Sequence, residues 1–285
     1  VDYICSRKLV VPVNKENVIK YGILDKKYES QIPEYIVLTM SPKKDYISKP
    51  ELFMLDLLSN YQWDRPIHLL NMGGDLNMGI KDYLEYDGFS YKFVPIRNRQ
   101  RTSEVGFADP DRLYDMMTNV YKWDALSYPD YYADNQHLYT FCGVLSQRAL
   151  FVNVAKEMVK AGHPERAVEM LDKCQACVPE KNYPLDISYL GYSNELMVMD
   201  MINLYYVLGE TEKASDLATR FLDKMFQSVN FYFQFYDYAK DDFDRARNMV
   251  LMVQDIAKDS GDDAVVALVD SGFDRLRADY GVVDE

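Results

Sequence analysis

The spacing of apolar residues divides the chain into two parts of different character. Before residue 106, short β-branched and apolar runs such as Lys8–Val13 and Tyr35–Met40 are bounded by Pro or Ser, which predicts strands. From Asp109 onward, apolar residues recur at helical spacing almost to the C-terminus. We therefore expect an α+β chain, with a small mixed α/β layer over residues 1–105 and an all-α domain over residues 106–285.

The clearest start signal in the first part belongs to a helix. Ser48-Lys49-Pro50-Glu51 has the form of a capping box with an early Pro, so a helix should run from Glu51 to Asn60. Its buried face should carry the apolar residues Leu52, Phe53, Leu55 and Leu58. The other elements expected are strands over Ile67–Leu70 and Ser90–Ile96, a helix over Ile80–Tyr86 and a polar loop over Arg97–Gly106.

The helical part contains the residue spacing of a tetratricopeptide-like helix hairpin. Gly162 is expected in the turn, with the small residues Ala155, Ala167 and Cys174 where the paired helices approach each other. Gly209 begins a second, degenerate copy, farther from Gly162 than the tetratricopeptide period of about 34 residues. Helices are predicted over Asp111–Trp123, Tyr131–Ala161 with a break near Cys142-Gly143, Pro164–Val178, Asn194–Leu208, Glu212–Gln227, Arg245–Lys258 and Ala264–Ala278.

Composition limits the classes of partner and cofactor. Asp and Glu number 45 against 32 Lys and Arg, a net charge of −13, which excludes nucleic acid as the main partner. With only 3 His and 4 Cys, we expect no metal, no cofactor and no disulfide framework. No apolar run reaches the length of about 18 residues that would span a bilayer. Because the chain begins with Val, we expect it to be part of a longer polypeptide.

Two short motifs have a structural and a chemical interpretation. Cys174-Gln175-Ala176-Cys177 has the form of a redox motif or a zinc half-site. It lies at a predicted helix end, where the helix dipole disfavours a thiolate, and no second ligand pair accompanies it, so packing is preferred. Gly73-Gly74 matches no phosphate-binding fingerprint, so a turn is favoured over a site for a sugar or another polar ligand.

Clustered acidic residues are expected to stabilise helix starts. Asp241-Asp242, Asp244 and Asp262-Asp263 fall where helices are predicted to begin, and carboxylates there suit the helix dipole. Their spacing is not that of a calcium-binding loop.

Two other clusters are candidate binding sites. Arg97, Arg99 and Arg101 form the main basic cluster, which is either a solvated loop or a contact for anionic lipid head groups or an acidic partner. The aromatic run Phe231–Tyr238 either packs between helices or forms a groove for a sugar or peptide. Its candidate contact residues are Phe231, Tyr232, Phe235 and Tyr236.

Several motifs of the first part occur in an order that resembles a known family. They are Asp45-Tyr46-Ile47-Ser48 running into Glu51, Met54-Leu55-Asp56, Trp63-Asp64-Arg65-Pro66-Ile67, Gly79 with Lys81, Tyr83-Leu84 and Asp87-Gly88-Phe89-Ser90-Tyr91-Lys92-Phe93-Val94-Pro95-Ile96. This order resembles the soluble C-terminal region of the bacterial protein O-mannosyltransferase-like family. Members combine a multi-spanning membrane half with tetratricopeptide-like helices. The resemblance covers residues 1–100, and the helical half agrees in architecture alone.

The resemblance implies that this chain is a non-catalytic region of a membrane-embedded glycosyltransferase, on the periplasmic side of the bacterial inner membrane. The family's catalytic acidic residues lie in the membrane half, so no catalytic residue is assigned here. The expected partners are an acceptor protein or the membrane half of the same polypeptide, with anionic lipid head groups as a further contact. The alternative is a free-standing periplasmic tetratricopeptide-like protein-binding module without a glycosyltransferase role. An enzyme acting through the α/β part is the third and least favoured class.

Overall fold

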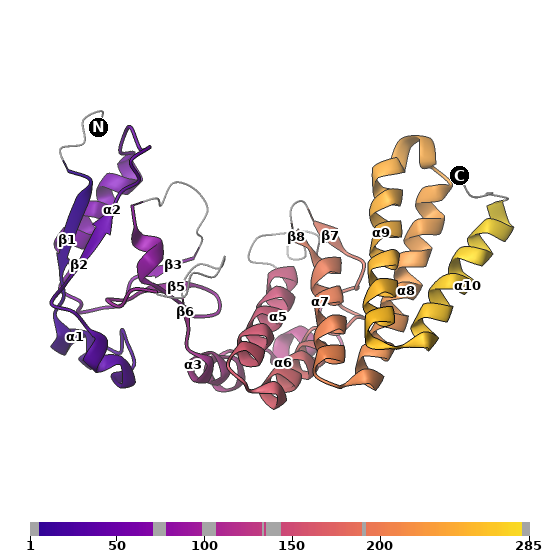
Figure 1. Cartoon of the computed structure of the whole chain (residues 1–285), viewed down its shortest axis with the longest axis horizontal. Coiled ribbons are helices and arrows are strands. Elements are labelled where there is room, and N and C mark those ends of the chain that lie inside the picture. The colour runs from indigo at the N-terminus through magenta and orange to yellow at the C-terminus, as the bar shows by residue number, and fades with distance from the viewer. Residues whose placement is uncertain are drawn as a thin grey trace. The chain divides into compact units, whose positions relative to one another are not determined.

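The chain folds into two compact units, Val1–Thr118 and Asn119–Glu285, in a computed structural model (Figure 1). The structure describes residues 6–70, 78–98, 107–132, 134, 144–189 and 192–280. The first unit combines short strands with helices and the second is mainly helical, which confirms the predicted α+β class. The domain boundary expected after residue 105 falls inside the first compact unit.

The first sheet consists of two antiparallel strands, β1 (Lys8–Pro12) and β2 (Tyr35–Thr39), both within predicted ranges. The connection between them holds helix α1 (Lys15–Lys20) and the 3-10 helix η1 (Lys26–Gln31). Each begins at a side chain that accepts a backbone N–H, Asn14 for α1 and Asp25 for η1. Alternation along β2 buries Ile36 and Leu38 and leaves Tyr35 exposed.

Trp63 lies in the core of this unit and is fully buried. Its indole N–H donates to the carbonyl oxygen of Pro12, at the end of β1, over 2.7 Å. Its ring stacks on Phe93 at a centroid distance of 5.5 Å and lies 4.6 Å from the ring of Tyr61. The backbone of Trp63 has a φ of 58°, a left-handed conformation that a bulky residue keeps only where its surroundings hold it. The hydrogen bond and the two aromatic contacts provide that support.

The second sheet has the strand order β3 (His68–Leu69), β5 (Tyr91–Phe93), β4 (Leu84–Tyr86) and β6 (Phe107–Ala108). β5 pairs antiparallel with both β3 and β4, and β6 joins β4 in parallel. Glu85 lies directly opposite Lys92 in this register.

The prediction of a helix over Ile80–Tyr86 is wrong for the second half of this range. Ile80–Tyr83 forms one 3-10 turn, η2, and the chain then extends into β4. β4 has a neighbouring strand at each edge, and such pairing overrides a short helical pattern because it satisfies the backbone groups on both sides.

Helix α2 (Lys49–Ser59) begins at the predicted capping box, with the Ser48 backbone N–H donating to Glu51 Oε2 over 2.8 Å. The predicted buried face is partly wrong. Leu58 is buried and Leu55 packs on the core, but the side chains of Leu52 and Phe53 are 47% and 70% exposed. Only one narrow face of α2 packs against the rest of the unit, and Leu52 and Phe53 lie outside that face.

Short helical segments join the two units along the chain. Helix α3 (Pro110–Asp115) runs into a π-helical turn, η3 (Met116–Val120), and a 3-10 turn, η4 (Asp124–Ser127), follows. The helix predicted over Asp111–Trp123 is therefore present in an interrupted form. The predicted break at Cys142-Gly143 and the turn at Gly73-Gly74 lie outside the described residues.

The second unit is a succession of helices along the chain (Figure 1). A short strand pair, β7 (Ser188–Tyr189) and β8 (Tyr192–Ser193), lies in the connection before α7. Helices α8 and α9 extend beyond their predicted ranges and meet at Gln234-Phe235, so the aromatic run lies at their junction. The helices are α5 (Val144–Lys160), α6 (Pro164–Cys177), α7 (Asn194–Val207), α8 (Thr211–Phe233), α9 (Tyr236–Ser260) and α10 (Asp263–Tyr280).

The hairpins α5–α6, α7–α8 and α9–α10 share the same turn. Gly162, Gly209 and Gly261 have φ values of 80°, 81° and 74°. After each glycine, the next backbone N–H bonds across the helix end over 2.9 Å, from His163 to Met158, from Glu210 to Tyr205 and from Asp262 to Ala257. This is the Schellman helix end, which needs a left-handed residue and therefore favours glycine. The hairpin predicted at Gly162 is confirmed, and Ala155 and Ala167 are fully buried in it.

Asp262 joins three helices at the last of these turns. Its Oδ1 accepts the Val265 backbone N–H at the start of α10 over 3.1 Å. Its Oδ2 accepts the hydroxyls of Tyr206 on α7 and Ser215 on α8 over 2.8 and 2.5 Å. Burial by itself would raise the pKa of this carboxyl, but the hydrogen bonds from Ser215, Val265 and Tyr206 lower it below the ordinary value. The capping role predicted for Asp262 is confirmed.

The acidic cluster at Asp241-Asp242 also lies at a helix start. Helix α9 is kinked at Ala239, whose φ of −126° is not helical, so regular helix begins again after this residue. Asp241 and Asp242 then occupy the first turn, where carboxylates suit the helix dipole.

Replacement of Gly79 by Ala should destabilise the first unit more than a change at another left-handed glycine. A Cβ at Gly79 (φ 80°) would lie 2.7 Å from the backbone N of Thr39, whereas a Cβ at Gly22 (φ 62°) meets nothing within 4 Å. We expect Gly79→Ala to lower the free energy of unfolding by roughly 2–5 kcal/mol and Gly22→Ala by about 1–2 kcal/mol. Urea unfolding in a Trp123→Phe background, followed by Trp63 fluorescence, measures both. Equal losses would show that Thr39 moves aside.

Replacement of Asp262 by Ala should destabilise the helical unit in a pH-dependent way. We expect a loss of about 1–3 kcal/mol at pH 7, from the lost cap and hydroxyl bonds. Because the folded-state pKa of Asp262 is lowered, its contribution is present above the unfolded pKa of about 3.9 and disappears as the pH falls through the folded value. Urea unfolding by far-UV circular dichroism at several pH values tests this, with exposed Asp259→Ala as control. A loss that is equal at acid and neutral pH would contradict the expectation.

Candidate functional site

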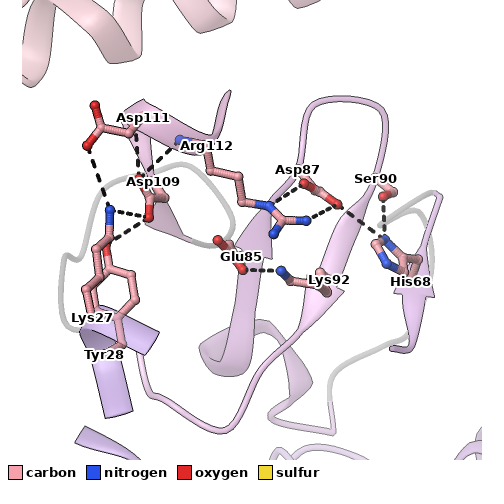
Figure 2. Close-up of polar contacts among 10 residues, drawn as sticks. All are labelled: Lys27, Tyr28, His68, Glu85, Asp87, Ser90, Lys92, Asp109, Asp111 and Arg112. Atoms are coloured by element: carbon pink, nitrogen blue, oxygen red, sulfur yellow. Dashed lines mark hydrogen bonds and ion pairs between the residues drawn. The ribbon is translucent and has the colours of Figure 1, made fainter. Parts of the chain in front are cut away.

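A buried ion pair lies at the centre of the second sheet (Figure 2). Glu85 on β4 and Lys92 on β5 are directly opposite each other, with Oε2 and Nζ 2.8 Å apart and both side chains 1% exposed. Burial raises the pKa of Glu85, and the charges of Lys92 and Arg112 reduce this rise without cancelling it. The sequence analysis did not single out this pair, because only the register of β4 and β5 brings the two residues together.

Further charges extend the network to both sides of this pair (Figure 2). Arg112 of α3 donates through Nε to Asp87 Oδ1 over 3.0 Å. Asp109 is 1% exposed, accepts the backbone N–H groups at the start of α3 and pairs with Lys27 Nζ over 2.6 Å. Tyr28 donates its hydroxyl to the same carboxylate over 3.3 Å. Each of these charged side chains lies beside one of opposite charge, and the pairs hold η1, α3 and the second sheet together.

His68 lies beside a serine and an aspartate without forming a proton relay. Its Nδ1 is 2.8 Å from Ser90 Oγ and 3.7 Å from Asp87 Oδ2 (Figure 2). A serine nucleophile and its orienting carboxylate must contact different ring nitrogens, whereas here both face Nδ1. Burial lowers the pKa of His68 despite the nearby Asp87. This geometry favours a structural role for His68 over a catalytic one.

A cleft of about 740 Å³ lies along β2 in the first unit. One end is closed by Gly79, whose backbone lies against the backbone of Thr39. The wall facing β2 carries Asp82 and Arg97, which pair over 2.6 Å. The lining residues are Ser30, Gln31, Pro33, Tyr35, Ile36, Val37, Thr39, Gly79, Asp82, Tyr83, Pro95, Ile96 and Arg97.

Arg97 is the member of the predicted basic cluster that the structure describes. Its guanidinium is 65% exposed, and the hydrogen bonds and charge of Asp82 raise its pKa further. Arg99 and Arg101 lie outside the described residues. The contact of this cluster with anionic lipid or an acidic partner stays a prediction. The sequence analysis missed the remaining cleft residues, although the uncharged run Tyr35–Thr39 was a usable signal.

The aromatic run forms an exposed surface at the junction of α8 and α9, which we call the aromatic tip (Phe231, Tyr232, Phe235, Tyr236 and Tyr238). Phe231 and Phe235 are 57% and 50% exposed, and their ring centroids lie 5.3 Å apart. Tyr238 is 94% exposed. Core packing, one of the two interpretations left open by the sequence, therefore does not describe Phe231, Phe235 and Tyr238, whereas Tyr232 is half-buried. Binding by Phe231, Tyr232, Phe235 and Tyr236 stays a prediction.

Phe233 shows why the run is divided between core and surface. It points back toward the helices, with its ring centroid 4.6 Å from Tyr280 and 5.7 Å from Phe243, and Tyr236 also contacts Phe243 at 5.3 Å. Helical periodicity turns adjacent residues to different sides, so these rings pack while Phe231, Phe235 and Tyr238 are exposed.

The Cys174–Cys177 motif lies in the last turns of α6. Cys174 is fully buried, and burial raises the pKa of its thiol to about 12, although nearby Arg148 opposes this. Burial also raises the pKa of Cys177. The structure thus disfavours a thiolate at either position, which supports the packing interpretation. Among the described residues, no group of three or more His, Cys, Asp or Glu side chains is arranged to hold a metal ion.

Arg148 is a buried cation that the sequence analysis missed. It is 2% exposed and donates to Asn194 Oδ1 over 2.5 Å and to the Tyr183 carbonyl oxygen over 3.0 Å. Burial lowers its pKa. Arg148 lies three, four and seven residues before the buried Phe151, Val152 and Ala155, so a charge on an apolar helix face was the signal. It connects α5 to the segment between α6 and α7.

The fold and its surfaces define an α+β chain in which a charge-braced α/β unit precedes a helix-hairpin unit. Residues 1–116 match a family model described as TMEM260-associated domain 2. TMEM260 is a protein O-mannosyltransferase-like protein. The match falls on the part of the chain whose motifs carry the resemblance, and it ends near Thr118, the last residue of the first compact unit. Neither the curated proteins nor the solved structures include a match to this chain.

The match thus links the first unit to a membrane glycosyltransferase-like family. No helix within the described residues is long and apolar enough to cross a membrane.

Removal of one partner of the Glu85–Lys92 pair should be far more damaging than removal of both. Lys92→Met leaves the Glu85 carboxylate buried alone, and we expect it to lower the free energy of unfolding by roughly 3–5 kcal/mol at pH 7. This loss should shrink toward acid pH. Lys92 lowers the pKa of Glu85, so its removal lets burial raise that pKa further, and the folded variant then binds a proton more readily than the original chain. The double variant Glu85→Met/Lys92→Met should unfold close to the original chain.

Urea unfolding of the two single variants and the double variant, in the same Trp63 fluorescence assay, measures the cycle. Additive losses in the double variant would show that the two charges do not interact.

Proposed function

We propose that this chain is the non-catalytic C-terminal region of a membrane-embedded protein O-mannosyltransferase-like glycosyltransferase and that it binds the acceptor protein or a partner. In this proposal the region lies on the periplasmic side of the bacterial inner membrane. The observation that carries the binding role is the aromatic tip, because several large aromatic side chains are exposed together at the α8–α9 junction.

Physical chemistry supports binding at the aromatic tip. Exposed aromatic clusters are unusual on monomeric proteins and mark sites that a partner covers. Tyr and Phe are also enriched in the energetically dominant parts of interfaces, since rigid rings bury large areas at small entropic cost. Exposed Asp237 lies within the tip, and exposed Asp241 and Asp242 follow it in sequence. An uncharged or basic protein surface therefore suits it better than an anionic lipid head group.

The glycosyltransferase context rests on residues 1–116. Their match to the TMEM260-associated domain agrees with the resemblance, which assigns the catalytic acids to membrane segments. The helical unit has the hairpin architecture expected for tetratricopeptide-like binding regions. If the gene encodes no membrane segments before Val1, the free-standing protein-binding module becomes the better proposal.

The double variant Phe231→Ser/Phe235→Ser tests the binding role in the protein that the gene encodes. We expect the hexose content of acceptor proteins, counted by mass spectrometry of envelope proteins, to fall at least tenfold, since hot-spot aromatic side chains contribute about 2 kcal/mol or more each. Thermal unfolding should be nearly unchanged because both rings are half exposed.

A matched control uses Leu52→Ser/Phe53→Ser, which removes two exposed apolar side chains from α2. This control should retain hexose transfer. Retained transfer in the Phe231/Phe235 variant would remove the aromatic tip from the proposal. Equal loss in both double variants would point to expression or folding instead of binding.

A further inference from the structure

The two edges of the β1–β2 sheet differ in the groups they present. The Met40 backbone N–H bonds to Arg7 O, and the Val13 N–H bonds to Glu34 O. Hydrogen-bonded pairs alternate along an antiparallel ladder, so Leu9/Leu38 and Val11/Ile36 are bonded pairs and Val10/Val37 and Pro12/Tyr35 are not. The backbone N–H and C=O groups of Tyr35 and Val37 therefore point away from β1, toward the free edge of β2.

This free edge faces the cleft. Tyr35 and Val37 line it, and β2 pairs only with β1 within the part of the chain that the structure describes. No described group bonds to the outward backbone atoms of Tyr35 or Val37. Gly79 covers the Thr39 end, so the accessible edge begins at Val37 and runs toward Tyr35.

The outer edge of β1 carries protecting residues, whereas the described residues leave the Tyr35–Val37 part of the β2 edge open. Proteins guard free edges with Lys, Pro, bulges or covering segments because an unguarded edge pairs with other strands. At outward positions β1 carries Lys8, Val10 and Pro12, of which Lys8 is charged and Pro12 has no N–H to offer. The outward positions of β2 carry Tyr35, Val37 and Thr39, which are uncharged and of types that favour strands. The asymmetry indicates that the edge of β2 is kept available for pairing.

We infer that the free edge of β2 binds an uncharged, extended segment of another protein by strand addition within this cleft. The added strand would bond to the N–H and C=O groups of Val37 and Tyr35, and its alternate side chains would lie beside half-exposed Val37 and exposed Tyr35. Among the described lining residues, the only charged ones are Asp82 and Arg97, and they pair with each other, so this lining offers no unmatched charge to a charged segment. This site lies in the first unit and does not depend on the aromatic tip.

A phage-displayed library of random twelve-residue peptides, panned on the 285-residue chain, supplies the probes. We expect enriched peptides with few charges and many β-branched residues. Their dissociation constants, measured by calorimetry, should rise at least about tenfold with Val37→Pro, which removes the outward N–H. The matched control is Val10→Pro at the opposite position of the ladder, where the lost N–H faces the other edge and binding should persist.

Peptide N-methylation provides a second measurement that does not depend on folding of the proline variants. Only every second residue of an added strand has its backbone N–H directed at β2. N-methylation of these residues should abolish binding, whereas N-methylation of the residues between them should change the dissociation constant by no more than about threefold. Three outcomes would overturn the inference. They are no enrichment over an uncoated surface, binding that survives Val37→Pro, or equal effects of N-methylation at the two sets of residues.

Discussion

The packing of Trp63 is the contact on which the first unit depends. Its indole bonds to Pro12 at the end of β1 and stacks on Phe93 of β5, so both sheets share one core through this side chain. Because β2 is held by β1, the position of β2 and of its cleft follows from the same contact. The left-handed backbone of Trp63 shows how strongly the surroundings determine its conformation, since an isolated Trp would not favour it.

The buried charges of the first unit serve structure. The pairs Glu85–Lys92, Asp87–Arg112 and Asp109–Lys27 connect elements that are distant in sequence. Such pairs stabilise little in net terms, but they make other arrangements costly, because any change leaves a charge buried alone. By contrast, the outward backbone groups of Tyr35 and Val37 on β2 have no bonding partner within the part of the chain that the structure describes.

The helical unit uses one turn repeatedly and varies the helices between the turns. The left-handed glycines at positions 162, 209 and 261 end α5, α7 and α9 in the same way. The α8–α9 junction has a different connection, Gln234-Phe235, between two long helices. Phe233 packs against Tyr280 and Phe243, and Tyr236 also contacts Phe243. Phe231, Phe235 and Tyr238 remain exposed. The repeated glycine turns thus build the helical scaffold, and the different connection between α8 and α9 produces the exposed aromatic surface.

The sequence by itself determined the features that depend on near neighbours. These include the strands Lys8–Pro12 and Tyr35–Thr39, the capping box at Ser48, the turn at Gly162 and the cap at Asp262. Tertiary structure alone decided that Leu84–Tyr86 is a strand, that Glu85 meets Lys92, that Phe53 is exposed and that the aromatic run is mostly at the surface. Caps and turns are satisfied within a few residues, whereas strand partners and buried faces are set by segments far along the chain, whose pairing a local pattern does not contain.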